Sequence, residues 1–182
     1  MAEYEPWEQK IMADNWERDQ QPKEPSQPDD RKRFFGVGFT GTREGMTSEQ
    51  CSAFYQVISE LPEFEIEFHH GDCIGADDNA ADIFDDWRHE PGEGELRIVC
   101  HPPIDATHRA WNKRADETRK PKTHFARNRD IVDESEMLIA CPQYMGPITK
   151  DTKGGTAYTV NYARKQKKRI VIIRPDGSIE TV

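Results

Sequence analysis

Two glycine-rich turns contain the residue types that bind anions. In the first, residues 38–45 (GFTGTREG), glycines allow close backbone approach, while Thr40, Thr42 and Arg43 supply hydroxyl and guanidinium donors. In the second, residues 153–156 (KGGT), two glycines and a threonine precede an expected helix, an arrangement that suits a phosphate. Taken alone, such a turn is weak evidence, because an ordinary connection between a strand and a helix looks the same.

A third turn, residues 69–77 (HHGDCIGAD), carries two carboxylates. Asp72 and Asp77 can cap the amides of the following helix, which is the commoner role, or accept hydrogen bonds from sugar hydroxyls. Residues of metal-ligand type also gather in this turn and after the next strand: His69, His70, Cys73, Cys100 and His101. Adjacent histidines on a strand point to opposite faces, and no second close-spaced pair completes a tetrahedral site. We therefore predict no metal and no cofactor.

A fourth segment, residues 108–129, is strongly basic within an acidic protein. It carries eight lysines and arginines against Asp116 and Glu117, a net charge of +6. It is either a solvated face that pairs with the acidic N-terminal residues or a phosphate site. The phosphate site is favoured by Arg127 and Asn128, which we expect at the start of a helix, where free amides face outward.

Short apolar runs alternate with helical patterns through the rest of the chain. The predicted strands are residues 34–40, 64–68, 96–100, 137–141 and 170–173, and a turn after them returns residues 179–182 as a short antiparallel strand. The first predicted helix follows a capping box at Thr47 and Gln50 and stops at Pro62. Further helices are predicted from about residue 75, over residues 128–133 and over residues 156–165.

This alternation predicts a Rossmann-like, doubly wound α/β domain, in which a mainly parallel sheet is covered by helices on both faces. In such sheets ligands bind outside the carboxyl ends of the strands. The four segments above are all expected at that one edge. Together they are a much stronger signal for an anion site than any of them alone.

Residues 1–30 differ in composition from the rest. They carry nine acidic and three basic residues, a net charge of −6 out of −9 for the chain, so the remaining residues are near −3. Tyr4, Trp7 and Ile11 follow helical spacing, and residues 21–30 contain three prolines. We predict an acidic N-terminal arm and tether over residues 1–30, followed by one domain over residues 31–182. The arm packs on the domain or a neighbouring subunit, or it binds a separate partner.

Composition also excludes some classes of function. No apolar run of about 18 residues occurs and the N-terminus is acidic, so neither a membrane span nor a secretory signal is expected. The four cysteines lie far apart, which is typical of reduced thiols. These features predict a soluble, cytoplasmic protein. The overall acidity disfavours a protein that coats nucleic acid.

Four motifs in this order resemble the SLOG superfamily, named for the Smf/DprA and LOG proteins, and most closely its small YspA/YpsA-like branch. They are GxTGTR at 38–43, HGDxxGAD at 70–77, ARNR at 126–129 and GGTA at 154–157. The resemblance covers residues 33–175. It implies a Rossmann-like domain that binds a nucleotide or nucleotide-derived ligand and usually forms dimers or larger homo-oligomers.

Carried over onto this chain, the resemblance places Gly41, Thr42 and Arg43 on one wall of the ligand pocket, and Gly71, Asp72 and Asp77 on the other. Arg127 and Asn128 contact a phosphate, and residues 154–156 form the main phosphate loop. With the neighbouring motif positions, the predicted ligand-binding residues are Gly38, Thr40, Gly41, Thr42, Arg43, Gly71, Asp72, Gly75, Asp77, Arg127, Asn128, Lys153, Gly154, Gly155 and Thr156.

The chain departs from the enzymatic LOG branch at one position. That branch has a PGGxGTxxE pattern whose glutamate acts on the ribose, whereas here Lys153 precedes the two glycines and no carboxylate stands at the matching place. We therefore favour a binding protein: a sensor, a carrier or a sequestering protein. The alternative is a nucleotide hydrolase with Asp72 or Asp77 as the acid–base group, Asp130 being a further carboxylate that can substitute.

Single-stranded DNA binding is a third, less favoured possibility. The arginine-rich segment resembles the DprA side of the superfamily. Against this stand the isoelectric point of about 5.2 and the scarcity of stacking surfaces, since Trp111 and Phe125 are the only aromatic residues among the bases.

Overall fold

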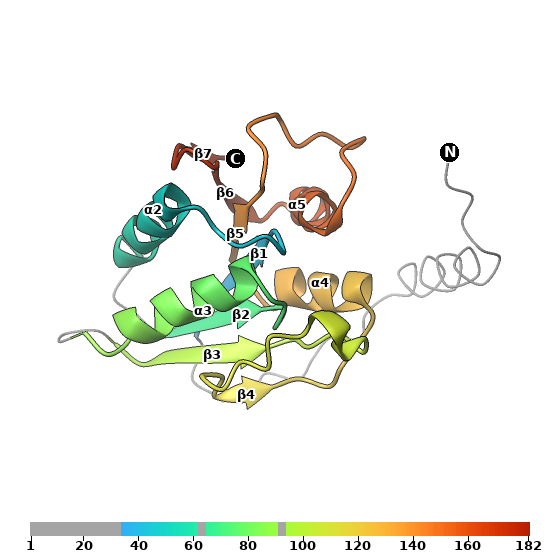
Figure 1. Ribbon diagram of the computed structural model, residues 1–182. Helices are drawn as coiled ribbons and strands as arrows, with labels where there is room; N and C mark the ends of the chain where they lie inside the picture. Colours follow the sequence, from blue (N-terminus) through green and yellow to red (C-terminus); the bar gives the residue numbers. More distant parts are fainter. Residues whose placement is uncertain (1–33, 62–64, 91–93) are drawn as a thin grey trace. The chain divides into compact units, whose positions relative to one another are not determined.

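The computed structural model describes residues 34–61, 65–90 and 94–182 (Figure 1). The predicted acidic arm, the stop at Pro62 and the beginning of the strand predicted from residue 64 lie outside the described residues. None of the described helices is long and apolar enough to cross a membrane.

Seven strands form one sheet in the order β4-β3-β2-β1-β5-β6-β7 (Figure 1). All neighbours are parallel except β7, which runs antiparallel to β6. The strands are β1 (Phe35–Gly41), β2 (Ile66–His70), β3 (Leu96–Cys100), β4 (Glu117–Thr118), β5 (Met137–Cys141), β6 (Arg169–Ile173) and β7 (Ile179–Thr181). The chain builds outward from β1 to β4 and then returns to β5 on the other side of β1. The order of the strands therefore reverses between β1 and β5.

Two helices cover each face of the sheet. The helices are α2 (Ser48–Ser59), α3 (Ala76–Trp87), α4 (His124–Asp133) and α5 (Gly155–Lys165). Alternate residues of β5 show the two cores: Met137 and Ile139 pack with residues of α2 and α3, whereas Leu138 and Ala140 pack with residues of α4 and α5. Both faces of β5 are buried, which explains its continuous apolar sequence. The predicted doubly wound α/β fold is confirmed.

Most predicted elements are found within one or two residues of their expected bounds. The capping box of α2 is present, since the Thr47 hydroxyl accepts from the Gln50 amide at 3.0 Å and the Gln50 side chain accepts from the Thr47 amide at 3.1 Å. Two differences from the predicted bounds have a clear cause. The second strand extends to His70, because His69 and His70 are buried in the sheet although they interrupt its apolar pattern. Helix α4 begins at His124, four residues earlier than predicted.

The sequence predicts no helix or strand in the segment between β3 and α4. This segment contains a short 3-10 helix, Ala106–His108, and the two-residue edge strand β4. Neither has an apolar pattern long enough to be recognised in the sequence. The segment is joined to neighbouring loops by backbone hydrogen bonds, including that from the Ile74 amide to the His108 carbonyl at 2.9 Å.

Candidate functional site

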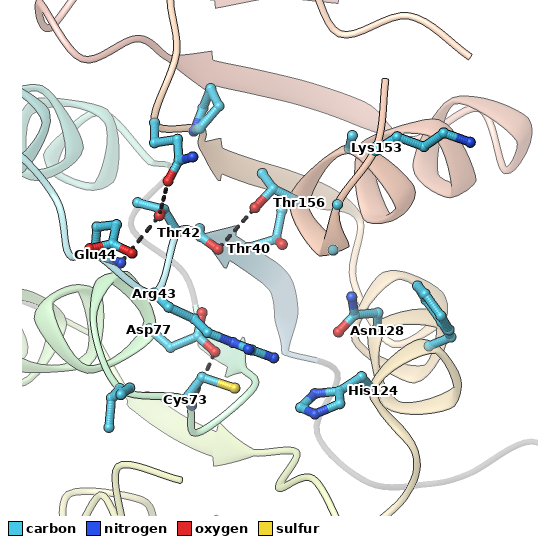
Figure 2. A pocket seen from close by; sticks show the side chains of 18 of the residues that line it. Thr40, Thr42, Arg43, Glu44, Cys73, Asp77, His124, Asn128, Lys153 and Thr156 are labelled. Atoms are coloured by element: carbon cyan, nitrogen blue, oxygen red, sulfur yellow. Dashed lines mark hydrogen bonds between the residues drawn. The ribbon is translucent and has the colours of Figure 1, made fainter. Parts of the chain in front are cut away.

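A cavity of about 550 Å³ opens at the carboxyl edge of the sheet, where the strand order reverses between β1 and β5 (Figure 2). It is lined by the residues that follow β1, β2 and β5 and by the first residues of α4 and α5. This is the place at which doubly wound sheets bind ligands. Its volume lies within the range of roughly 300–1,000 Å³ that is typical of small-molecule sites.

The turn after β1 is fixed by close packing against the turn after β2. The Ala76 amide donates to the Thr42 carbonyl at 2.9 Å. A Cβ atom at Gly75 would lie 2.3 Å from the Arg43 carbonyl oxygen, and Gly75 has φ +92°, so only glycine fits there. A Cβ atom added at Gly41 would lie 2.4 Å from the Cβ of Ala76. These contacts hold Thr42 and Arg43 against the cavity.

The N-terminus of α5 is open toward the cavity. Its N-cap, Gly154, has φ +108° and makes no side-chain capping hydrogen bond. A Cβ atom at Gly155 would meet only the Asn128 side chain, at 4.0 Å. The Thr156 hydroxyl donates to the Gly41 carbonyl at 2.9 Å and so ties α5 to the end of β1 (Figure 2). The first amides of the helix therefore have no side-chain cap, and the two glycines that begin the helix border open space.

Helix α4 begins at the opposite side of the same cavity. Its N-cap, Thr123, also makes no side-chain capping hydrogen bond. The Asn128 amide group donates to the Thr159 hydroxyl at 2.7 Å, which in turn donates to the Gly155 carbonyl at 2.8 Å. This chain of hydrogen bonds fixes α4 against α5. Two helix N-termini, each with partial positive charge, thus converge on one space, which favours an anion.

A buried ion pair forms the floor of the cavity. Arg127 is 7% exposed and Asp77 is 5% exposed, and Nη1 of Arg127 lies 3.6 Å from the Asp77 carboxylate. Nη2 donates to the Cys73 sulfur at 2.9 Å, while Nε is buried with no hydrogen-bond partner among the described residues. Burial raises the pKa of Asp77, and the Arg127 guanidinium opposes that shift. Burial also raises the pKa of Cys73 to about 11, so its thiol stays protonated near neutral pH.

Three basic side chains and two acidic ones line the cavity. Arg43 extends into it, toward His124 and Asn128, whereas Lys153 points away from Arg43 at the rim (Figure 2). Burial, followed by the charge of Arg127, lowers the pKa of His124 and favours its neutral form. With Glu44 and Asp77 as the acids, the lining carries a formal charge of +1. The cavity is therefore positive within a protein of net charge −9.

Eleven of the fifteen predicted ligand-binding residues line the cavity. The other four, Gly38, Gly71, Asp72 and Gly75, lie outside its lining. The three glycines allow neighbouring groups to approach closely. Gly38 contacts α4 and Gly75 contacts the Arg43 carbonyl. Gly71 contacts the Arg127 guanidinium, and a Cβ atom added at Gly71 would lie 1.1 Å from Nη1 of Arg127. These glycines shape the site without forming its surface.

Asp72 has a structural role. It is fully buried, has φ +53°, and its carboxylate accepts from Arg109 Nε and from the Asn112 amide, the latter at 2.9 Å. Its carbonyl also accepts from the Ala110 amide at 2.8 Å. The carboxylate thus holds the loop of residues 109–112 and does not face the cavity. Asp72 thus lies outside the cavity lining, and its role as a ligand or an acid–base group stays a prediction.

Sequence reasoning missed nine lining residues: Glu44, Cys73, Ile74, His124, Phe125, Pro142, Gln143, Tyr144 and Ala157. Residues 142–144 follow β5 directly, so the rule that ligands bind beyond strand ends was a usable signal for them. His124 and Phe125 were missed because the start of α4 was placed at residue 128. The Tyr144 hydroxyl is buried with no hydrogen-bond partner among the described residues.

The basic segment of residues 108–129 is mostly neutralised inside the domain. Its ion pairs are Arg109 with Asp72, Arg114 with Asp82, Arg119 with Glu134, Lys122 with Asp130 and Arg127 with Asp77. Of these basic residues, only Arg127 lines the cavity. The segment is therefore chiefly an ion-paired surface of the domain. The interpretation as a phosphate site applies only to its last residues, at the beginning of α4.

The residues of metal-ligand type separate onto the two faces of the sheet, as the alternation of strand side chains predicts. His70 contacts the Cys100 sulfur at 3.2 Å on the face of α2 and α3, whereas His69 contacts His101 at 3.1 Å on the face of α4. Burial is the main reason why the pKa of His69 and of His70 falls to about 3 and that of His101 to about 2. All three imidazoles are neutral at pH 7.

The fold is similar to two solved structures. One is the molybdenum cofactor binding protein of the phototrophic bacterium Rippkaea orientalis, with a TM-score of 0.57 and 19% identity over 78% of this chain and 77% of that one. The other is DNA processing protein A (DprA) of Streptococcus pneumoniae, with a TM-score of 0.53 and 19% identity over 76% of this chain and 50% of that one. No family model and no curated protein matches this chain. The chain therefore shares its fold with a cofactor-binding protein and with a DNA processing protein.

Proposed function

We propose that the cavity binds a nucleotide or nucleotide-derived small molecule through its phosphate groups, and that the protein acts as a sensor, a carrier or a sequestering protein. The observation that carries this proposal is the convergence of two helix N-termini without side-chain caps on one positively charged cavity at the point where strand order reverses. Phosphate is the biological anion that such amides and guanidinium groups suit best.

The lining divides into parts that match the parts of a nucleotide. The amides of residues 154–156 and the Arg43 guanidinium suit the phosphates. Asp77 and Asn128 offer hydrogen bonds to ribose hydroxyls. Phe125 and Tyr144 offer aromatic surface for a base. The shared fold with a protein that binds the molybdenum cofactor is compatible with a small-molecule ligand.

Calorimetry against mononucleotides, dinucleotides, cyclic nucleotides and ADP-ribose tests this proposal. The informative variant is Gly155→Val, because Gly155 lines the cavity and, apart from its chain neighbours and its own helix backbone, the nearest atom to the new Cβ is the Asn128 side-chain nitrogen, at 4.0 Å. The matched control is Gly146→Val, where an added Cβ meets nothing within 4 Å and which lies outside the lining. We expect at least one ligand of the panel to bind the parent and the control, and not Gly155→Val.

Two results contradict the proposal. One is that no phosphorylated compound binds the folded protein. The other is that a ligand binds the parent and Gly155→Val with equal affinity, which would locate the ligand elsewhere.

Asp77 supports a second candidate function, the hydrolysis of a nucleotide. It is the one predicted acid–base carboxylate that lines the cavity, and its raised pKa is suited to proton transfer. Long incubation of nucleotides with the protein, followed by chromatography, tests this function. Release of base or phosphoribose that stops in Asp77→Asn supports a hydrolase. Recovery of intact nucleotide at high protein concentration excludes the hydrolase and supports a protein that only binds the nucleotide.

We also propose that the chain is a SLOG protein with an acidic arm over residues 1–30, that it forms homo-oligomers and that it works in the cytoplasm. Sedimentation of the full chain and of a variant that lacks the arm tests the assembly.

Single-stranded DNA is disfavoured as a partner, because five basic residues of the segment 108–129 already pair with carboxylates of the domain. Gel-shift binding with steep salt dependence would contradict this part.

A further inference from the structure

A second polar cluster lies on the face of the sheet that α4 covers, and it is separate from the cavity lining. It brings together side chains from three elements: His69 of β2, His101 just after β3, and Glu134 at the C-cap of α4. His69 pairs with Val99 in the strand register, so His101, two residues on, is its diagonal neighbour on the same face. The cluster is therefore a consequence of the sheet register and of the way α4 ends.

The ligand atoms of the cluster lie close enough together to approach the spacing of a coordination sphere. His69 Nδ1 is 3.1 Å from His101 Nε2 and 3.9 Å from the nearer carboxylate oxygen of Glu134, and all three atoms lie within 4.8 Å of one another. In a tetrahedral zinc site with bonds of about 2.0–2.1 Å, neighbouring ligand atoms are separated by about 3.3 Å. Two imidazoles and one carboxylate form a known ligand set for such an ion.

The outer ring nitrogens of the two histidines, those that face away from the cluster, lack a hydrogen-bond partner among the described residues. The two residues are 0% and 1% exposed, and these nitrogens are His69 Nε2 and His101 Nδ1. If His69 carries its proton on Nδ1, its bare Nε2 faces the Glu67 carboxylate at 3.6 Å, which is unfavourable. An ion between the imidazoles accepts a lone pair from each, and the proton of His69 then lies on Nε2, facing Glu67.

We propose that His69, His101 and Glu134 bind a divalent transition-metal ion of the zinc type, at a site distinct from the nucleotide cavity. Glu67 acts as a positioning residue, because a carboxylate beside the distal nitrogen fixes the tautomer of a metal-bound histidine. The three protein ligands leave one position for water or another donor, as in catalytic zinc sites.

Arg119 provides a sharp test, because it competes with the ion. Its guanidinium donates to the same Glu134 oxygen at 2.8 and 3.2 Å, and it also pairs with Glu117. If the cluster served only as a hydrogen-bonded network, loss of Arg119 would weaken it. If the cluster binds a metal, the variant Arg119→Gln frees the Glu134 carboxylate and removes a positive charge, so metal affinity rises.

The experiment is a titration of the full chain, freed of metal by a chelator, with Co²⁺ as a spectroscopic probe for Zn²⁺. We expect one equivalent to give the intense visible d–d bands of a tetrahedral site without a thiolate charge-transfer band, and Zn²⁺ to displace it. We expect Glu134→Gln to weaken binding at least tenfold, His101→Gln to abolish the bands, and Arg119→Gln to bind about threefold tighter or more.

The matched control is Glu60→Gln, because Glu60 is exposed and is the C-cap of α2 as Glu134 is of α4. This variant is expected to bind Co²⁺ as the parent does. Glu134→Gln keeps the shape of an exposed side chain, so it remains informative if His101→Gln does not fold. No binding at millimolar Co²⁺, equal affinity in Glu134→Gln and the parent, weaker binding in Arg119→Gln, or a thiolate band that points to His70 and Cys100 would each overturn the proposal.

Discussion

Arg43 and Arg127 both line the cavity, but they differ in what else each one does. Arg43 is exposed, whereas Arg127 is buried against Asp77 and Cys73. We expect Arg43→Ala to lower nucleotide affinity by roughly 10- to 150-fold, because a charge-assisted contact contributes about 1.5–3 kcal/mol, and to leave the unfolding free energy unchanged. Calorimetry and urea unfolding of the same preparation measure the two effects. Equal affinity in Arg43→Ala and the parent would remove Arg43 from the site.

Arg127→Ala is expected to affect both quantities. It leaves the Asp77 carboxylate buried without its cation, which costs about 3–5 kcal/mol when the carboxylate stays charged and less if it takes up a proton. The affinity for the nucleotide falls as well, because Arg127 lines the cavity. If Arg127→Ala unfolds at the same urea concentration as the parent, the ion pair is not a structural element of the cavity floor.

Asp72 distinguishes a carboxylate that holds a loop from one that contacts the ligand. Asp72→Asn keeps the acceptor for the Asn112 amide and tolerates the positive φ, but it removes the charge opposite Arg109. We expect a loss of about 1–3 kcal/mol in unfolding free energy and no change in nucleotide affinity. A tenfold loss of affinity with unchanged stability would restore Asp72 as a ligand contact.

At the scale of elements, the sequence is most informative where apolar periodicity is strong. Strands β3 and β5 are found at their predicted bounds, and the Thr47–Gln50 capping box correctly places the start of α2. The start of α4 was missed because His124 and Phe125 lack the apolar spacing on which the prediction relied. Strand β4 is two residues long and has no pattern to detect.

The candidate site was predictable in outline for a topological reason. Parallel strands point their carboxyl ends to one edge, so turns far apart in sequence had to meet there. What the sequence could not provide was the direction of each side chain within a turn. Asp72 and Asp77 lie five residues apart, yet one holds a loop and the other faces the cavity. The ion-pair partners of the basic segment likewise depend on contacts between distant elements.

Across the whole molecule, three buried histidines should make stability depend on pH. The pKa of His69 and of His70 is about 3 and that of His101 is about 2 in the folded chain, against 6.5 ordinarily. As pH falls below 6.5 the unfolded chain binds protons at these sites and the folded chain does not, so the folded state is progressively destabilised. Between about pH 7 and pH 5.5 each histidine removes about 1 kcal/mol of unfolding free energy.

The raised pKa of Asp77 acts in the opposite direction, because the folded chain then binds a proton more readily than the unfolded one. Three histidines outweigh this single fully buried carboxylate, so the net effect is a loss of stability toward acid. Urea unfolding at several pH values in the presence of a chelator measures the slope. The slope of the unfolding free energy against pH gives the number of protons that the chain takes up on unfolding. We expect His101→Gln to reduce this number by about one. A stability that is constant over this range would mean that the histidines are not buried in neutral form.

We propose that the cavity between β1 and β5 holds the phosphates of a nucleotide at two helix N-termini. The most direct measurement is a titration of the ¹⁵N-labelled full chain with the tightest ligand of the nucleotide panel, followed by amide chemical shifts. We predict that the largest shifts occur at the amides of residues 154–156 and of the first turn of α4, with smaller changes at Thr42 and Arg43. Shifts confined to other parts of the chain, with these amides unmoved, would contradict the account.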